Sequence, residues 1–101
     1  MRLETLHEAA WLTVLHAAWL ADCGLPNNLE ASITKAKCGA AVREITQACI
    51  RMLGPIAVCR DHLLEKWFRD ARITDLYEGT GEIQRLIIAR EVLGYTRNEL
   101  S

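Results

Sequence analysis

The sequence has 101 residues, of which 50% are hydrophobic and 25% are charged. This length corresponds to one domain, and the composition is that of an ordinary globular protein, which excludes disordered and collagen-like chains. The formal net charge of −1 argues against a protein that binds nucleic acid by neutralising its phosphates. Alanine and leucine are frequent and aromatic residues make up only 6%, so helices are favoured over a β-sandwich or barrel.

We expect neither a targeting signal nor a membrane span in this sequence. Residues 9–21 are mostly apolar, but the segment is too short to cross a bilayer and His16 interrupts it. The first four residues include an acid and do not resemble a signal peptide. The four cysteines have no C-x-x-C spacing, and no histidine completes a zinc pattern. We therefore expect a cytoplasmic protein with buried free thiols and no metal site.

A first helix is predicted over about residues 2–22. Apolar and small residues recur on one helical face at Leu3, Leu6, Ala10, Val14, Ala17, Ala18 and Ala21. Gly24 ends this helix, and Pro26 marks the break that follows. Trp11, Leu12 and Leu15 lie away from this face, so the helix is apolar nearly all round. We expect a partner, within an oligomer or a larger protein, to cover that second side.

A second helix is predicted over about residues 28–53. Asn27 and Glu30 have the spacing of an N-cap and its capping-box acid, and the pair Gly54-Pro55 ends the helix. The residues expected to face inward are Leu29, Ile33, Ala36, Ala40, Ile45, Ala48 and Met52. Small residues at positions 39–41 would allow a neighbouring helix to approach closely.

Two shorter helices are predicted after it. Asp61 is the expected cap of a helix over about 62–75, whose expected core residues are Leu64, Trp67, Phe68 and Ala71. A break with two glycines separates it from a helix over about 81–93, which Gly94 ends. Four helices joined by short loops predict an all-α fold, an antiparallel four-helix bundle forming one domain over residues 1–101.

The segment from residue 65 to residue 90 carries the most specific pattern. It contains the pair Arg69-Asp70, the turn Tyr77-Glu78-Gly79-Thr80 and the run Ile83-Gln84-Arg85. In this order and spacing the segment closely resembles the signature near the C-terminus of the acyl-CoA dehydrogenase family. Residues 17–24 and 32–36 look like the two preceding helices of that family's C-terminal bundle. The resemblance therefore covers nearly the whole chain.

The resemblance implies roles for the residues of the turn. Glu78 matches the base that removes the α-proton of an acyl-CoA thioester, and its backbone N–H would polarise the thioester carbonyl. Gly79 would leave room for the thioester end of the substrate. Hydride from the β-carbon would pass to FAD, and the product would be a trans-2-enoyl-CoA. Bound substrate and flavin would exclude water from the carboxylate and so make it a stronger base.

The resemblance also implies that Thr80, Gly81 and Glu82 contact FAD. The same three residues suit the start of a helix, with a threonine N-cap and a first-turn acid, and both interpretations can hold together. Near the end of the second helix the family pattern is a glutamine followed by Gly-Gly-x-Gly, which contacts the FAD pyrophosphate. Here Arg51 stands in place of the glutamine, and only Gly54 of the glycines is kept. Arg51 either attracts the pyrophosphate by its charge or is simply a cation at a helix end.

Family enzymes place a helical domain and a β-domain before this bundle, and the 101 residues hold neither. We therefore expect the isolated chain to bind FAD weakly or not at all and to have no dehydrogenase activity. The function expected is that of the C-terminal domain, or a subunit piece, of an FAD-dependent acyl-CoA dehydrogenase. Its partners would be an acyl-CoA substrate and either further copies of itself or a complementary dehydrogenase subunit. The alternative is a non-catalytic helical assembly module derived from that family.

Overall fold

The computed structural model describes residues 1–96 and 98–99. It contains the α-helices α1 (Arg2–Asp22), α2 (Asn28–Leu53), α3 (Leu64–Thr74) and α4 (Gly81–Leu93). Two short 3-10 turns, Gly54–Val58 and Arg60–His62, connect α2 to α3. The described residues form no strand, so the all-α class is confirmed. The predicted bounds of the first, second and fourth helices agree with the structure.

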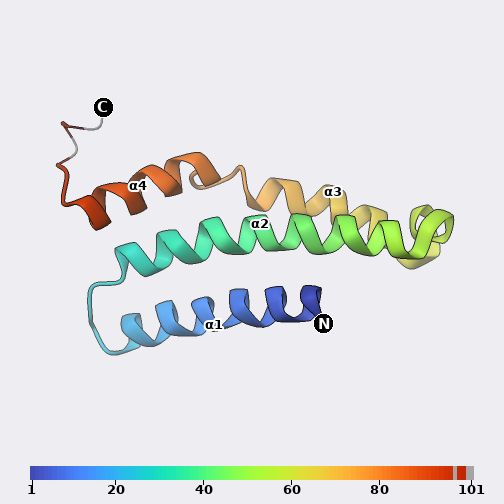
Figure 1. Cartoon of the computed structure of the whole chain (residues 1–101), viewed down its shortest axis with the longest axis horizontal. Coiled ribbons are helices and arrows are strands. Elements are labelled where there is room, and N and C mark those ends of the chain that lie inside the picture. Colours follow the sequence, from blue (N-terminus) through green and yellow to red (C-terminus); the bar gives the residue numbers. More distant parts are fainter. Residues whose placement is uncertain (97, 100–101) are drawn as a thin grey trace.

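Helix α2 is the centre of the fold (Figure 1). Helix α1 packs along one side of it, and α3 and α4 follow one another along another side, both running back toward the start of α2. This arrangement differs from a closed bundle, in which four helices surround a common core. The molecule measures 49 × 31 × 21 Å, and its radius of gyration is 16.2 Å. A compact chain of this length has a radius of gyration of about 13 Å, so the fold is elongated.

The buried core is thin and consists mainly of small side chains. Its hydrophobic members are Ala10, Ala17, Ala41, Ala57, Leu64 and Ala71, and no large side chain among the described residues is fully buried. Leu64 and Ala71 were predicted correctly, but Trp67 and Phe68 are 55% and 39% exposed. Met52, at 70% exposed, was also predicted wrongly. These residues share a helical face with core positions, but within residues 1–96 and 98–99 no other element covers them fully.

The helix ends match the predictions in part. Asn27 occupies the N-cap position of α2, but its side-chain amide donates a hydrogen bond of 3.1 Å to the carbonyl oxygen of Ala17 instead of capping α2. The predicted cap at Asp61 is wrong, because this residue lies in the second 3-10 turn. Helix α3 begins after Leu63, which has a left-handed φ of 54°. Gly94 ends α4 with a φ of 71°, as predicted.

The four cysteines are free, but they differ in exposure. Cys23 and Cys59 are exposed, so the expectation of buried thiols is wrong for these two. The described residues hold no cluster of three or more side chains suited to binding a metal ion. Within residues 1–96 and 98–99, no helix has the length and apolar character that crossing a membrane requires.

Candidate functional site

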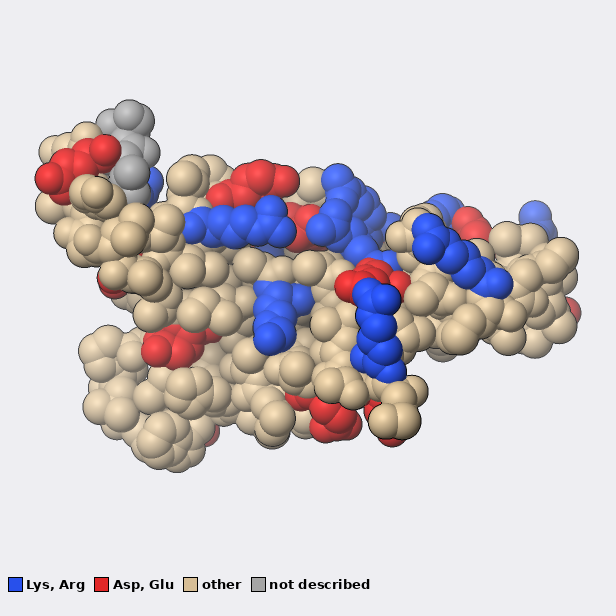
Figure 2. All heavy atoms as spheres, viewed as in Figure 1, with Lys and Arg blue, Asp and Glu red and all other residues tan. Residues whose placement is uncertain are grey.

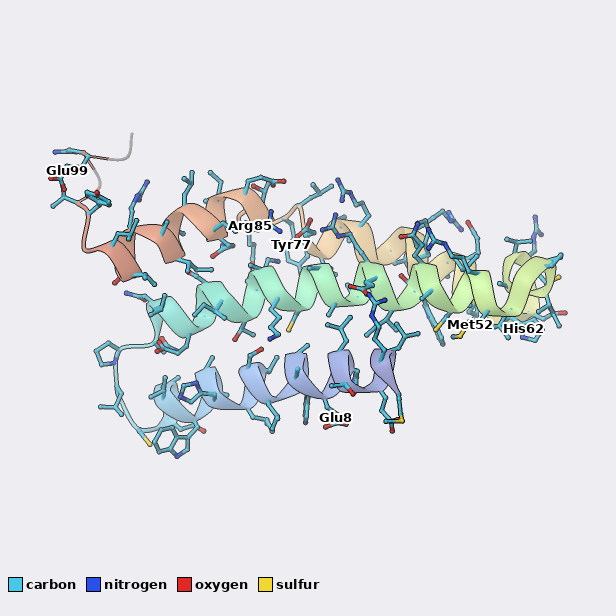
Figure 3. The ribbon with its side chains drawn as sticks, in the orientation of Figure 1. Glu8, Met52, His62, Tyr77, Arg85 and Glu99 are labelled. Atoms are coloured by element: carbon cyan, nitrogen blue, oxygen red, sulfur yellow. The ribbon has the colours of Figure 1, made fainter. Side chains whose placement is uncertain are left out.

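The turn that joins α3 to α4, residues 75–80, carries the candidate base and is called here the Glu78 turn. Glu78 has a φ of 54° and Gly79 a φ of 101°, so two successive residues are left-handed. A left-handed conformation costs a residue other than glycine about 1–2 kcal/mol, so the surrounding structure must hold Glu78 in place. The Glu78 side chain is exposed. Figure 3 shows the neighbouring Tyr77 between α3 and α4, beside the middle of α2.

Lys35 of α2 holds the start of this turn. Its ammonium group donates a hydrogen bond of 2.5 Å to the backbone carbonyl of Thr74, the last residue of α3. The same nitrogen lies 4.3 Å from the centre of the Tyr77 ring, which is a cation–π contact. One side chain from α2 therefore contacts residues on both sides of position 75.

Asp75 is buried at the beginning of the Glu78 turn, with 8% of its surface exposed. Its Oδ2 lies 3.7 Å from Nη1 of Arg43 on α2 and 3.9 Å from Nη1 of Arg72 on α3. A Cβ atom built on Gly39 would lie 2.7 Å from Asp75 Oδ1, and one built on Gly81 would lie 2.9 Å from it. Asp75 was not among the residues predicted from the sequence. The glycines at positions 39 and 81 were its visible signal, since both make room for this carboxylate.

Thr80 and Glu82 form the N-terminal end of α4, as predicted. The Thr80 hydroxyl accepts a hydrogen bond of 3.3 Å from the backbone N–H of Ile83. The pKa of Glu82 is lowered from its ordinary value of 4.5, mainly by a hydrogen bond from its own backbone N–H and then by one from Thr80. Arg85 and Arg72 lower this pKa further by their charge, against an opposing effect of desolvation. Glu82 is therefore ionised at neutral pH and already places a negative charge at this helix end.

Gly79 and Gly81 are explained by contacts within the chain. The φ of 101° at Gly79 favours glycine, and a Cβ there would lie 2.6 Å from Nε2 of Gln84. Gly81 is buried against Asp75. The predicted contacts of Gly79 with substrate, and of Thr80, Gly81 and Glu82 with FAD, stay predictions.

Arg51 and Gly54 lie far from the Glu78 turn. Gly39, beside Asp75, is twelve residues before Arg51 on the same helix, which corresponds to about 18 Å along the helix axis. Figure 3 shows the separation, with Met52 and His62 at one end of α2 and Tyr77 beside its middle. A Cβ built on Gly54 would have nothing within 4 Å, so its φ of 64° is what favours glycine there. Within this chain Gly54 lines no tight cradle for a phosphate.

A groove of about 800 Å³ runs between α2 and α3. It is lined by Ala40, Arg43, Glu44, Gln47, Phe68, Arg69 and Arg72. Arg69 already pairs with Glu65, at 2.5 Å between Nε and Oε1.

Figure 2 shows that the basic side chains of this face gather mostly over α2, α3 and α4, whereas the α1 part is mostly uncharged with a few acids.

The comparisons with known proteins agree on one family. The model of the acyl-CoA dehydrogenase C-terminal domain matches residues 1–93. Cyclohexane-1-carbonyl-CoA dehydrogenase of Geobacter metallireducens is 41% identical over 86 residues, which cover 85% of this chain and 23% of that protein. An acyl-CoA dehydrogenase of Bacillus subtilis is 39% identical over 94 residues, which cover 93% of this chain and 25% of that protein. Acryloyl-CoA reductase (NADH) of Anaerotignum propionicum is 37% identical over 91 residues, which cover 90% of this chain and 23% of that protein.

A solved structure has the same fold. It is described as an electron transferring flavoprotein of Acidaminococcus fermentans, with a TM-score of 0.88 and 32% sequence identity. The match covers 91% of this chain and 24% of that one. The 101 residues thus span about a quarter of the length of the relatives that they match. By sequence and by fold, the chain belongs to the acyl-CoA dehydrogenase family and corresponds to its C-terminal domain.

Proposed function

We propose that this chain is the C-terminal part of an FAD-dependent acyl-CoA dehydrogenase and that Glu78 is its proton-abstracting base. One observation carries the proposal: an exposed carboxylate stands on a left-handed turn that is held on one side by Lys35 and Asp75 and on the other by Thr80. A base has to be held in one orientation and remain open to its substrate. The contacts of Lys35, Asp75 and Thr80 hold the backbone on both sides of Glu78, and its carboxylate is exposed to solvent.

The proposed reaction is the α,β-dehydrogenation of an acyl-CoA thioester. The Glu78 carboxylate takes the α-proton, and the backbone N–H of Glu78 donates a hydrogen bond to the thioester carbonyl, where negative charge develops. A bound FAD would supply the acceptor for the hydride that leaves the β-carbon. One proton and one hydride are removed, and a 2-enoyl-CoA is formed.

The residues assigned to FAD form two groups. Thr80, Gly81 and Glu82 would contact it beside Glu78. Because Glu82 is ionised, we assign this end of α4 to an uncharged part of the cofactor and not to its phosphates. Arg51 lies about 18 Å along α2 from Gly39, which is beside Asp75, so we assign Arg51 and Gly54 to a different part of FAD, the pyrophosphate.

The experiment is a chimera in which residues 1–93 replace the matching region of the Bacillus subtilis relative. We expect the purified chimera to contain flavin, to be reduced by an acyl-CoA and to exchange the α-proton of the thioester with solvent. Glu78→Gln should lower the rate of flavin reduction and the rate of α-proton exchange about a hundredfold or more, without loss of flavin. Glu91→Gln, an exposed acid on α4, leaves both rates unchanged. Full activity in the Glu78→Gln chimera would overturn the assignment.

The isolated chain provides a separate test. Catalysis requires a substrate cleft and flavin contacts beyond the Glu78 turn, and the 101 residues cover about a quarter of the relatives' length. We expect no turnover by the purified chain supplied with FAD, an acyl-CoA and an electron acceptor. Measurable turnover under these conditions would contradict this expectation.

A specific observation supports the second candidate function, a non-catalytic assembly module. Trp11, Leu12, Leu15 and Trp19 of α1 are 52%, 61%, 47% and 58% exposed, an apolar surface that calls for a partner. Sedimentation equilibrium of the chain, wild type against Leu12→Glu, would measure self-association through this surface. The assembly module predicts a stable oligomer whose complex with a dehydrogenase subunit shows no flavin absorbance, whereas the enzyme part predicts that this complex is yellow.

A further inference from the structure

Asp75 is the only charged residue that the structure buries within residues 1–96 and 98–99. It follows α3 directly and stands three residues before Glu78. Taking a carboxylate out of water is costly unless its charge is compensated. An uncharged residue could fill the same place at a lower desolvation free energy, so the charge itself calls for an explanation.

The carboxylate fits between two helices by shape. Its Oδ1 occupies the space that a side chain on Gly39 of α2, or on Gly81 of α4, would fill. The distances to a Cβ built at these positions, 2.7 and 2.9 Å, are shorter than real contacts allow. The end of α3, the middle of α2 and the start of α4 therefore meet at one side chain.

Two cations lie beside this carboxylate. Arg43 of α2 and Arg72 of α3 lie within 4 Å of its Oδ2. Gly81 at the start of α4 lies against Oδ1 and gives it room. The two arginines attract the negative charge, so the charge holds the end of α3 against α2 more tightly than a neutral side chain of equal shape would.

We propose that Asp75 is a positioning residue for Glu78. Its carboxylate fixes the end of α3 against α2 and α4, and the short connection from position 75 to position 81 then has to present Glu78 in one direction. This inference rests on the proposed function in one respect only, namely that Glu78 is the base. The effect on the turn itself is independent of that function.

The first test uses the 101-residue chain and measures hydrogen exchange at the backbone amides of Leu76 and Tyr77, which donate hydrogen bonds of 3.0 and 3.1 Å to the Ile73 carbonyl. Asp75→Asn keeps the shape and removes the charge, and we expect exchange there to accelerate about tenfold. The matched control is Asp70→Asn on α3, whose carboxylate is exposed and pairs with Lys66. Asp70→Asn should change the exchange rates of these amides by less than about twofold. Unchanged exchange in Asp75→Asn would overturn the proposal.

A second variant separates loosening of the turn from unfolding of the chain. Arg43→Gln removes one of the cations and leaves the carboxylate and both glycines in place. We expect about threefold faster exchange at Leu76 and Tyr77, with the amides of α1 unchanged. Equal acceleration in α1 and in the turn would mean general destabilisation, and it would overturn the specific role of Asp75.

The third test uses the chimera. Asp75→Asn should lower kcat and the rate of α-proton exchange about tenfold, while KM for the acyl-CoA and the flavin content change less than about twofold. If Glu78→Gln is inactive and Asp75→Asn is fully active, the positioning role is wrong and the proposed function stands. If Glu78→Gln keeps full activity, the proposed function fails, and the exchange experiment in the isolated chain still decides whether Asp75 holds the turn.

Discussion

The ammonium nitrogen of Lys35 lies 4.3 Å from the centre of the Tyr77 ring and also binds the carbonyl oxygen of Thr74. A single side chain of α2 thus satisfies a carbonyl at the end of α3 and contacts the residue before Glu78. The carbonyls of the last helical turn have no partner within the helix, so this contact supplies one of them with a donor. The position of Glu78 along the molecule therefore depends on α2.

We expect Lys35→Met to destabilise the chain. It keeps most of the apolar stem but loses the cation–π contact and the charged hydrogen bond, which together contribute about 1–3 kcal/mol. The measurement is the free energy of unfolding in urea. Lys37→Met, at an exposed position on the same helix, should change this free energy by less than about 0.5 kcal/mol. Equal losses in the two variants would show that the Lys35 contacts contribute nothing.

The effect of Gly39→Ala should depend on residue 75. In a helix interior, alanine is more stable than glycine by about 0.5–1 kcal/mol. The new methyl group would lie 2.7 Å from Asp75 Oδ1, so we expect Gly39→Ala to destabilise the wild-type chain. In an Asp75→Ala background the clash is absent, and the same change should stabilise. Urea unfolding of the four proteins gives the coupling free energy, expected at about 1–3 kcal/mol. Additive effects would mean that the two residues do not contact.

The stability of the start of α4 should depend on pH through Glu82. Because its folded pKa is lowered from 4.5, its ionised form stabilises the folded chain. This contribution is complete above the unfolded pKa and is lost as the pH falls through the lowered folded pKa. Glu82→Gln should therefore lower the melting temperature at neutral pH and leave it nearly unchanged well below pH 4.5.

Thr80→Val provides the control for this pH dependence. It removes the hydroxyl that is the second cause of the lowered pKa of Glu82. The loss of melting temperature that Glu82→Gln causes at neutral pH should therefore be smaller when valine replaces Thr80. A loss of the same size at all pH values, with or without the hydroxyl, would contradict the link between the charge and the helix end.

The helix bounds were predictable from the sequence because local residues determine them. Gly54 and Gly94 have positive φ angles and end their helices, and Thr80 caps α4 through its own hydroxyl. The start of α3 was not predictable, because Leu63 has a left-handed φ that no cap residue marks. The two 3-10 turns that the chain makes after α2 determine where α3 starts.

Burial and the environment of the site were less predictable than the helices. Periodicity places Trp67 and Phe68 on the face of Leu64, but it does not reveal whether another element covers that face. Likewise, the turn motif located Glu78, whereas Asp75 acquires its role through Gly39, a residue far away in the sequence. Long-range contacts of this kind cannot be read from the spacing of residues along one helix.

The separation of Arg51 from the Glu78 turn leads to a prediction on FAD binding. Arg51 is exposed in the last turn of α2, at the position where the family pattern has a glutamine. Pro55, in the 3-10 turn that follows, removes a backbone donor. If its charge replaces the lost donors, Arg51→Ala should weaken FAD binding by the chimera about tenfold in a fluorescence titration. Arg60→Ala, an exposed cation in the second 3-10 turn, should leave the affinity unchanged. Equal affinity of wild type and Arg51→Ala would mean that Arg51 is only a cation at a helix end, favoured there by the helix dipole.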